Sequence, residues 1–357
     1  MNEQINSLQS KPKVAVTGAG GLVGGHLVEH LAGLGYGVVA VVRNSPAFLQ
    51  ELAEKYKDSI EIRQADVSQI ETLERAFAGC DVVVHAAGSV DPFGSREFIF
   101  ATNVGGTKNA LAAAGTANVR QFIFISSLSV ITGQGDQFDV DETATLKPCG
   151  ESYADSKIEA ERVVMSRSKE IKVTSLRPGF IYGPRERSWM PRLINSIATG
   201  KAMLIDGGKK QTNVIYAGNL CKAVELALLN EKSYGQAFNL TDGQVISKKE
   251  LFDAIADGLG LPRVTKQVPG AVAKLFCQMV SSVAPMLPVE WQRKLARFSR
   301  AAFRLAAVNQ GFSIKKAEVE LGYTDRIPFA QGMADTLATF KNASNHERQQ
   351  LSGSSVR

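Results

Sequence analysis

A stretch near the start of the chain, from Lys13 to Leu31, most constrains the fold. A β-branched run, Val14 to Thr17, is followed by closely spaced glycines and then by apolar residues at helical spacing. This succession predicts a strand, a tight turn and an amphipathic helix. In an α/β protein it is the first corner of a βαβ unit, and the N–H groups that open its helix can bind a pyrophosphate.

Three glycines of the turn have separate expected tasks. Gly18 permits the tight turn, Gly21 lets the backbone approach the pyrophosphate, and Gly24 allows close packing of the helix on the strand. Leu22 opens the helix and is expected to contact the dinucleotide with them. A glycine-rich turn alone is equally typical of an ordinary loop. The strand before it and the helix after it indicate a dinucleotide site.

The second strand indicates which dinucleotide binds. The run from Tyr36 ends in Val41, Val42 and Arg43, whereas NAD-binding folds of this kind place an acid here for the ribose 2′-hydroxyl. The guanidinium of Arg43 suits a 2′-phosphate, so NADP is favoured and NAD is the alternative. A solvated arginine at a strand end is the simpler interpretation of the same residue.

Two further strands end in residues suited to the dinucleotide. Asp66 follows the third strand, beside Val67, and can accept a hydrogen bond from the adenine amino group. Ala86, Ala87 and Gly88 follow the fourth strand and are small enough to pass beneath the cofactor. For Asp66 the alternative role is that of N-cap to the next helix.

Tyr153 and Lys157 supply the predicted chemistry. Their spacing places the phenol and the ammonium on one face of a helix, about one turn apart. A nearby cation favours the phenolate, so we expect a lowered pKa and a general acid/base that works near neutral pH. A Tyr-x-x-x-Lys pair alone is usually a surface pair. Here it follows the glycine turn, Asn103 on a helix and Ser127 at a strand end, and that order favours a catalytic site.

These residues resemble the motifs of the extended short-chain dehydrogenase/reductases, the NAD-dependent epimerase/dehydratase superfamily. The resemblance covers roughly residues 11–340. The matching motifs are Thr-Gly-Ala-Gly-Gly-Leu-Val-Gly at 17–24, Asn-Val-Gly-Gly-Thr at 103–107, Ser127, Tyr153 with Lys157, and Arg-Pro-Gly-Phe-Ile-Tyr-Gly-Pro at 177–184.

The resemblance implies hydride transfer at a nicotinamide. Tyr153 would exchange a proton with the substrate oxygen, Ser127 would hydrogen-bond that oxygen, and Lys157 would hold the nicotinamide ribose. Asn103 would support a proton-relay water, and Pro178 would lie against the cofactor. The resemblance also implies a homodimer formed by helices around the catalytic residues.

The segment after the last motif indicates the branch. Nucleotide-sugar epimerases of this superfamily carry an Arg where this chain has Thr212, Asn213 and Val214, and an Asp where it has Asn219. Without that Arg, bidentate recognition of a sugar diphosphate is not supplied. Sugar dehydratases need an acid pair where Leu128 and its neighbour stand. The pattern is more similar to the 3β-hydroxysteroid and sterol dehydrogenases.

The sequence therefore predicts an NAD(P)-dependent oxidoreductase that interconverts a secondary alcohol and a ketone on a hydrophobic, steroid-like or long-chain, substrate. Three alternatives stay open. One is a nucleotide-sugar epimerase with the same Tyr and Lys, and another is a non-catalytic dinucleotide sensor. The third is an interaction scaffold at a membrane.

Charge is concentrated in one part of the chain. The net charge is +6, yet residues 263–316 hold ten Lys or Arg and one acid, a balance of +9. No nucleic-acid-reading module accompanies these residues, so nucleic acid is not an expected partner. Residues 291–308 sort into an apolar and a basic helical stripe. They predict either an ordinary lobe helix or a peripheral contact with a membrane surface or a lipophilic pocket.

The cysteines, histidines and apolar segments predict the redox state of the thiols, metal binding and the location of the protein. The four cysteines form no paired motif, and the histidines show no ligand spacing, which predicts reduced thiols and no metal. The polar start of the chain does not resemble a secretory signal. The apolar run from Val268 to Pro288 is interrupted by Lys274, Pro285 and Pro288, so a membrane-spanning helix is not expected there. We expect a cytoplasmic protein, with association at a membrane surface through 291–308 as the alternative.

The predicted fold class is α/β, a doubly wound parallel sheet of the Rossmann type with a smaller, mainly helical C-terminal substrate lobe. The dinucleotide-binding domain spans 12–183, and 211–244 return to it. The substrate lobe comprises 184–210 and 245–340. Residues 1–11 and 341–357 are expected to be disordered tails.

Overall fold

The computed structural model describes residues 11–91, 94–132, 135–283, 286–288, 290–291, 295 and 300–353. The tail predicted at 1–11 lies, apart from Lys11, outside these residues. Residues 292–294 and 296–299 of the amphipathic segment predicted at 291–308 also lie outside them, and its described part is α13 (Arg300–Ala307) with Trp291, Leu295 and Val308.

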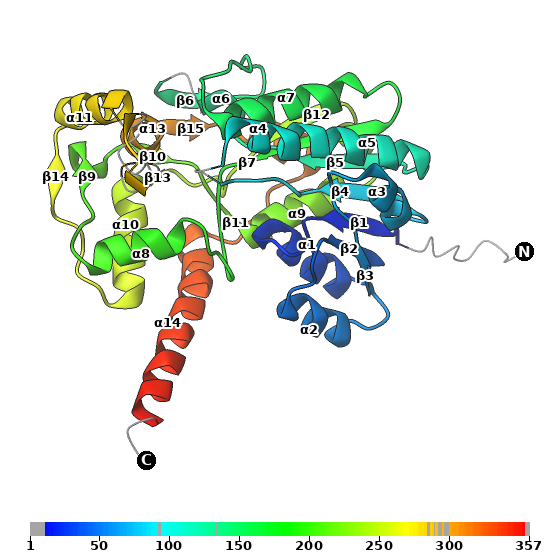
Figure 1. Ribbon diagram of the computed structural model, residues 1–357, viewed down its shortest axis with the longest axis horizontal. Coiled ribbons are helices and arrows are strands. Elements are labelled where there is room, and N and C mark those ends of the chain that lie inside the picture. The colour runs from blue at the N-terminus through cyan, green and yellow to red at the C-terminus, as the bar shows by residue number, and fades with distance from the viewer. Residues whose placement is uncertain are drawn as a thin grey trace, which may run out of the picture.

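A seven-stranded, wholly parallel sheet forms the centre of the molecule (Figure 1). Its strand order is β12-β7-β5-β4-β1-β2-β3, so the chain reverses its direction of winding between β1 and β4. Strands such as β2 are buried along their whole length because helices cover both faces. The strands are β1 (Val14–Thr17), β2 (Val38–Val42), β3 (Ile60–Gln64), β4 (Val82–His85), β5 (Gln121–Ile125), β7 (Lys172–Pro178) and β12 (Gln236–Leu240).

Two hydrophobic cores bind the helices to the sheet, one on each face. Leu27 and Leu31 of α1 lie in the first core, with side chains of α2 and α9. Phe77 of α3 and Val164 of α7 lie in the second, with side chains of α5. The helices are α1 (Leu22–Gly33), α2 (Ala47–Lys55), α9 (Ala217–Ala227), α3 (Ile70–Phe77), α5 (Gly106–Thr116) and α7 (Ser152–Ser166). The predicted doubly wound α/β fold is confirmed.

The helix expected around Asn103 is not uniform. It consists of α4 (Arg96–Phe100), a π-helical segment at Ala101–Gly105, and α5. The Gly106 N–H donates to the carbonyl oxygen of Ala101, five residues back, which inserts an extra residue into the turn. Asn103 lies in this widened turn.

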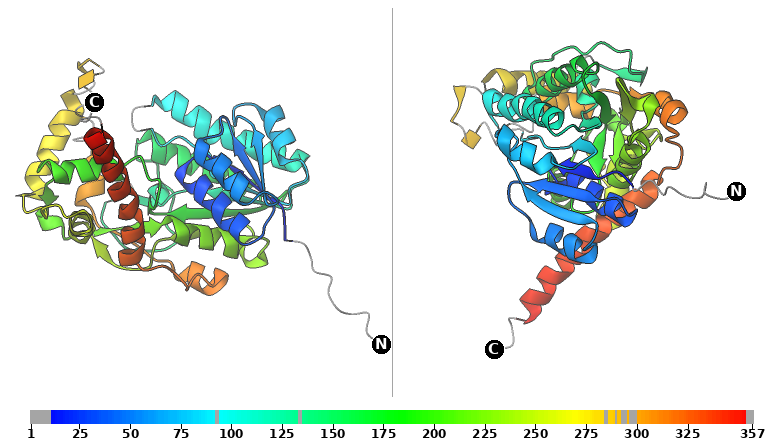
Figure 2. Two further views of the ribbon diagram at one scale, coloured as in Figure 1. Left: turned by 90° about the horizontal axis from the view of Figure 1, so that it is seen from below. Right: turned by 90° about the vertical axis from the view of Figure 1, so that its right-hand side faces the viewer.

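A smaller lobe packs at one end of the sheet around its own core, which includes Tyr182, Ile255, Phe329 and Leu337. Figure 2 shows this lobe beside the parallel sheet. Its helices are α8 (Met190–Ala198), α10 (Lys248–Leu259), α11 (Gly270–Val283), α13 and α14 (Phe329–Gly353). Four small two-stranded sheets pair β8 (Phe180–Tyr182) with β11 (Val214–Tyr216), β9 (Leu204–Ile205) with β14 (Gln267–Val268), β10 (Gln211–Thr212) with β13 (Ile246–Ser247), and β6 (Gln137–Val140) with β15 (Gln310–Phe312).

Two segments differ from the predicted domain limits. Ile314, Leu321 and Tyr323, predicted to belong to the lobe, pack into the first core beneath the central sheet. Residues 341–353, predicted to be a disordered tail, continue α14 to Gly353. The second difference has a local reason in residues 347–351, the run Glu-Arg-Gln-Gln-Leu, because all of these residue types favour a helix.

Among the described residues, no helix is long and apolar enough to cross a membrane. The four cysteines are free thiols.

Candidate active site

The glycine turn and the end of β4 meet at the carboxyl edge of the sheet. Thr17 and His85 are register partners there, and Gly18 follows Thr17 with a φ of 69°. A Cβ atom on Gly18 would lie 2.9 Å from the Cα atom of Ala87. A Cβ atom on Gly24 would lie 2.2 Å from the Gly18 carbonyl oxygen. A side chain is therefore excluded at both positions, and the positive φ of Gly18 suits the tight turn expected there.

The start of α1 fits a pyrophosphate. Its N-cap residue, Gly21, makes no side-chain capping hydrogen bond, and the first turn carries no acidic residue. The N–H groups of this turn and the helix dipole thus favour an anion. Leu22, at the first helical position, is partly exposed. Since the sheet reverses its winding beside this turn, the site lies where open α/β sheets bind ligands.

Arg43 and Asp66 lie together at the ends of β2 and β3. Arg43 is exposed, and its charge contributes to lowering the pKa of Asp66. The larger cause of that lowered pKa is hydrogen bonding, because the Asp66 carboxylate accepts from the Ser68 backbone N–H at 2.8 Å and from its hydroxyl at 2.7 Å. Asp66 does not cap α3, whose N-cap residue is Gln69.

The other predicted cofactor residues, Val67, Ala86, Ala87, Gly88 and Pro178, also lie at the carboxyl edge of the central sheet. The Val67 carbonyl oxygen accepts a hydrogen bond from Asn109. Ala86 and Ala87 are partly exposed and Gly88 is exposed. Pro178, at the end of β7, accepts through its carbonyl oxygen from the Leu128 N–H at 2.9 Å.

Lys157 projects from α7 towards the ends of β4 and β5. Its Nζ atom donates to the carbonyl oxygen of Ile125 at 2.8 Å and lies 4.8 Å from the centre of the Phe124 ring. A Cβ atom on Gly88 would lie 3.6 Å from this Nζ and 3.1 Å from Oδ1 of Asn103. The structure therefore brings predicted catalytic and cofactor residues into one place.

Tyr153 differs from its expected electrostatics. Burial raises the pKa of its phenol, and a hydrogen bond with Ser127 opposes that rise. Lys157 does not produce the expected lowering, since burial reduces its own pKa to about 8 and its ammonium is bound to the Ile125 carbonyl. The prediction of a lowered Tyr153 pKa is wrong for this structure.

Asn103 is held by three hydrogen bonds. Its Oδ1 atom accepts from the Ser89 N–H at 2.7 Å, and its Nδ2 atom donates to the Ser89 carbonyl at 3.0 Å and to the Ser156 hydroxyl at 2.9 Å. Ser156 donates in turn to the Tyr153 carbonyl oxygen at 2.8 Å. Asn103 thus ties the loop after β4 to the helix that carries Tyr153.

A buried ion pair lies behind these residues and was not predicted. Glu161 of α7 pairs with Arg177 of β7, and both side chains are buried. The Glu161 carboxylate also accepts from Ser126 at 2.6 Å and from Ser175 at 2.9 Å. Its position four residues after Lys157, on the same helix face, was the signal that could have identified it.

A series of buried side-chain hydrogen bonds joins the glycine turn to Asn103. Thr17 Oγ1 lies 2.9 Å from Nδ1 of His85, and His85 Nε2 lies 3.2 Å from Oγ1 of Thr107. Thr107 donates to the Asn103 carbonyl oxygen at 2.6 Å. Burial lowers the pKa of His85 to about 3, with a smaller contribution from Lys157, so the ring is neutral. The sequence did not indicate this role for His85, because the residue ends an otherwise apolar strand, β4.

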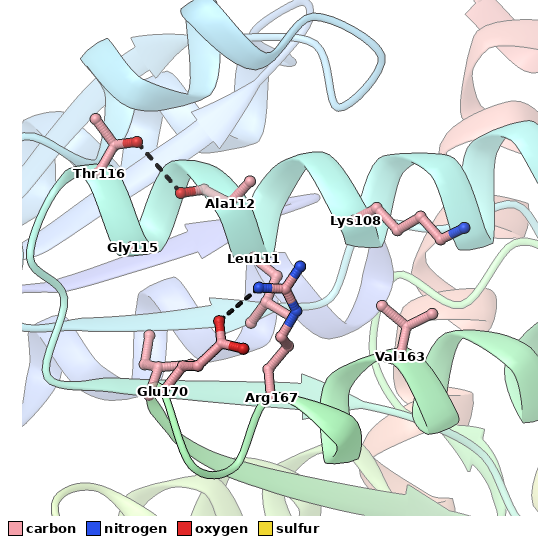
Figure 3. Close-up of a pocket in the computed structure, with 9 residues that line it drawn as sticks. Lys108, Leu111, Ala112, Gly115, Thr116, Val163, Arg167 and Glu170 are labelled. Carbon is pink, nitrogen blue, oxygen red and sulfur yellow. Dashed lines mark hydrogen bonds and ion pairs between the residues drawn. The ribbon is translucent and has the colours of Figure 1, made fainter.

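A cavity of about 280 Å³ lies elsewhere, between α5 and α7 (Figure 3). Leu111 and Val163 line it with Arg167 and Glu170, which form an ion pair. The cavity lies towards the C-terminal ends of both helices. Asn103 precedes α5 and Tyr153 lies in the first turn of α7, so both are at the opposite ends of these helices. This cavity is separate from the site described above.

The described residues contain no group of three or more His, Cys, Asp or Glu side chains arranged to hold a metal ion.

The fold and this site define a class, the nicotinamide-dependent oxidoreductases with a Rossmann-type sheet. The sequence profile of the NAD dependent epimerase/dehydratase family matches residues 14–241, and the chain belongs to that family. At this level the predicted enzyme, an NAD(P)-dependent dehydrogenase or reductase acting on CH–OH groups, is confirmed.

Three curated relatives cover most of the chain. A 4-hydroxy-2-methyl-3-oxo-4-farnesyl-3,4-dihydroquinoline-1-oxide ketoreductase of Stigmatella aurantiaca is 28% identical over 89% of this chain and 93% of its own. A 2-alkyl-3-oxoalkanoate reductase of Shewanella oneidensis is 26% identical over 92% and 87%. The 3beta-hydroxysteroid-dehydrogenase/decarboxylase isoform 1 of Arabidopsis thaliana is 26% identical over 92% and 79%. The predicted similarity to the 3β-hydroxysteroid dehydrogenase-like branch is confirmed.

Among solved structures, MoeE5 in complex with UDP-glucose and NAD is similar with a TM-score of 0.72 and 21% identity. The match covers 93% of this chain and 99% of that one. It shows that the two proteins share a fold.

Proposed function

We propose that this enzyme is an NADP-preferring ketoreductase for a hydrophobic, steroid-like or long-chain substrate. The observation that carries the proposal is the convergence of Tyr153, Ser127, Lys157 and Asn103 beside the end of β4 and the glycine turn. In this arrangement a substrate oxygen can lie against a phenol and a hydroxyl while it faces a dinucleotide cleft.

The residues present fit a nicotinamide dinucleotide. Gly18, Gly21 and the start of α1 would hold its pyrophosphate, Arg43 and Asp66 its adenosine end, and Lys157 its nicotinamide ribose. When bound, this cofactor supplies or accepts the hydride.

Tyr153 is suited to give a proton. Because burial raises the pKa of its phenol, the group is protonated at neutral pH and can donate to the oxygen of a ketone. Ser127 is hydrogen-bonded to the phenol and would hold the same substrate oxygen. A protonated phenol is the state from which reduction of a ketone begins.

Two observations support a hydrophobic substrate. Nucleotide-sugar epimerases carry a phosphate-binding Arg at the positions of Thr212 and Asn213. Both of these residues are neutral and buried, so no guanidinium is present there to donate two hydrogen bonds to a diphosphate. The relatives described above are named for a farnesylated ketone, a 2-alkyl-3-oxoalkanoate and a 3β-hydroxysteroid.

The test follows nicotinamide absorbance with purified full-length protein. We expect NADPH oxidation with a 2-alkyl-3-oxoalkanoate or a 3-ketosteroid, and none with UDP-glucose. Tyr153→Phe should keep dinucleotide binding and lose about a hundredfold or more of turnover, because the proton donor is removed. Conversion of UDP-glucose without net cofactor turnover would instead establish the epimerase, and unchanged turnover in Tyr153→Phe would refute the role of the phenol.

Arg43→Ala tests the dinucleotide preference. Loss of the guanidinium should weaken NADPH binding about tenfold or more while NADH binding stays unchanged, because only NADPH carries the 2′-phosphate. Fluorescence titration with both dinucleotides measures this. Arg75→Ala, which removes an exposed arginine from α3, is the matched control and should alter neither affinity. Equal weakening of both dinucleotides by Arg43→Ala would contradict the proposal.

A further inference from the structure

Helix α11 presents an apolar face to the outside of the lobe. Val272, Leu275, Met279 and Val283 are 56%, 60%, 54% and 51% exposed. They recur at helical spacing, so they form one continuous stripe rather than scattered side chains. Phe276, also exposed, lies in the same stripe.

The opposite side of the same helix is already packed. Ala273 and Cys277 are buried, and α11 packs against α13. Figures 1 and 2 show α11 at the outer margin of the lobe, remote from the central sheet. The exposed stripe is therefore additional to the face that holds the helix in the fold.

The apolar surface does not end with the helix. Met286 and Trp291, further along the chain, are 85% and 54% exposed. Monomeric soluble domains rarely expose so many large apolar side chains in one short segment, and those that do use them to bind a partner or a membrane.

The charge of this segment identifies the kind of partner. Residues 263–316 carry ten Lys or Arg and one acid, and α11 itself contains Lys274 and no acidic residue. Lys274 is exposed but lies on the side of the helix away from the apolar stripe, so the positive charge on which the docking depends is that of the segment as a whole. An apolar face within a basic segment matches the headgroup region of an anionic bilayer, which accepts hydrocarbon side chains and attracts cations.

The same charge opposes contact with a second copy. A symmetric pairing through α11 would bring two basic segments against each other, and like charges across an interface are costly. A bilayer with anionic lipids neutralises them instead.

We propose that α11 is a peripheral membrane-docking helix, which lies along an anionic lipid surface with Val272, Leu275, Met279 and Val283 inserted among the acyl chains. Fourteen residues make up the helix, and no described helix can span a bilayer, so this docking is reversible and parallel to the surface. The inference is independent of the substrate proposed above. It places the anchor on α11, ahead of the segment 291–308 from which the sequence predicted membrane contact.

Vesicle flotation with the full chain tests the proposal. Wild-type protein should float with vesicles of phosphatidylcholine and phosphatidylglycerol at low salt, and less with phosphatidylcholine alone or at high salt. The double variant Leu275→Asp/Met279→Asp should bind about tenfold or more weakly, because two carboxylates would enter the acyl region. Val319→Asp, at a position 78% exposed on the segment after β15, is the matched control and should bind as the wild type does. Dinucleotide affinity and circular dichroism should be the same in all three proteins.

Three results would overturn the proposal. One is wild-type protein that does not float with anionic vesicles at low salt. Another is a double variant that floats as well as the wild type. The third is a wild-type dimer that the double variant converts to a monomer while neither protein binds vesicles, which would make this face an interface between copies.

Discussion

The charge on Lys157 results from opposing influences within a few ångströms. Burial disfavours the ammonium and lowers its pKa to about 8, while the carboxylate of Glu161 raises it. Glu161 also accepts hydrogen bonds from Ser126, which precedes Ser127, and it pairs with Arg177. We therefore expect Glu161 to be a positioning residue that acts through Lys157 and Ser127 without touching substrate.

Glu161→Gln tests this positioning role. With the carboxylate gone, the pKa of Lys157 should fall below about 8, and the alkaline limb of the pH profile of kcat should move to lower pH. The variant should also lose about 3 to 5 kcal/mol of stability, because the buried Arg177 guanidinium would lack its anion. Urea unfolding and a pH series of initial rates measure the two effects separately.

Glu159→Gln is the control on the same helix. Glu159 is partly exposed and forms only a 3.9 Å ion pair with Arg162, so its loss should change stability by less than about 1 kcal/mol and leave the pH profile in place. A Glu161→Gln enzyme with the wild-type pH profile would show that the ion pair is only structural.

Spacing along one helix allowed Tyr153 and Lys157 to be predicted from the sequence. Their pattern is local, and so is the glycine turn that holds Gly18 and Gly24. His85 could not be found in this way, because its partners Thr17 and Thr107 come from distant segments that meet only in the folded sheet. The raised pKa of Tyr153 also depends on tertiary burial, which spacing does not report.

The element that carries Asn103 shows what a periodic pattern misses. The apolar residues between Arg96 and Ala114 predict a helix, and a helix is present, but its middle is a π-helical turn. Gly106 packs against Val67 so closely that a Cβ atom would lie 2.8 Å from a Val67 side-chain carbon. That contact, with the hydrogen bonds from Asn103 to Ser89, supports the widened turn. One inserted residue changes a helical pattern too little for sequence reasoning to detect.

At the level of the whole molecule, alternating strand and helix patterns were sufficient to predict the sheet, because parallel strands buried on both faces are distinctive. They did not predict the path of the chain after β15. Ile314 and Tyr323 return to the core under the central sheet, and Tyr323 donates to the Thr241 carbonyl at 3.1 Å. This segment therefore packs with the core of the dinucleotide-binding domain, and not with the separate core of the lobe. Such a return depends on tertiary contacts between segments remote in sequence.

The stability of the fold should depend on pH through His85, whose ring packs against Phe122 and Phe124 of the second core. Its pKa is about 3 in the fold and about 6.5 in an unfolded chain, so between these values the unfolded chain binds a proton that the fold excludes. Stability contributed by neutral His85 is fully present above about pH 6.5 and is lost as pH falls towards 3, by about 1.4 kcal/mol per pH unit. Urea unfolding at about pH 7.5 and about pH 4.5 should show a smaller difference for His85→Gln than for wild type, because glutamine does not titrate there. The variant should start less stable at the higher pH, since it disturbs the hydrogen bonds to Thr17 and Thr107. Equal differences in the two proteins would mean that His85 takes up its proton without unfolding, and that the link from the glycine turn to Asn103 does not require a neutral ring.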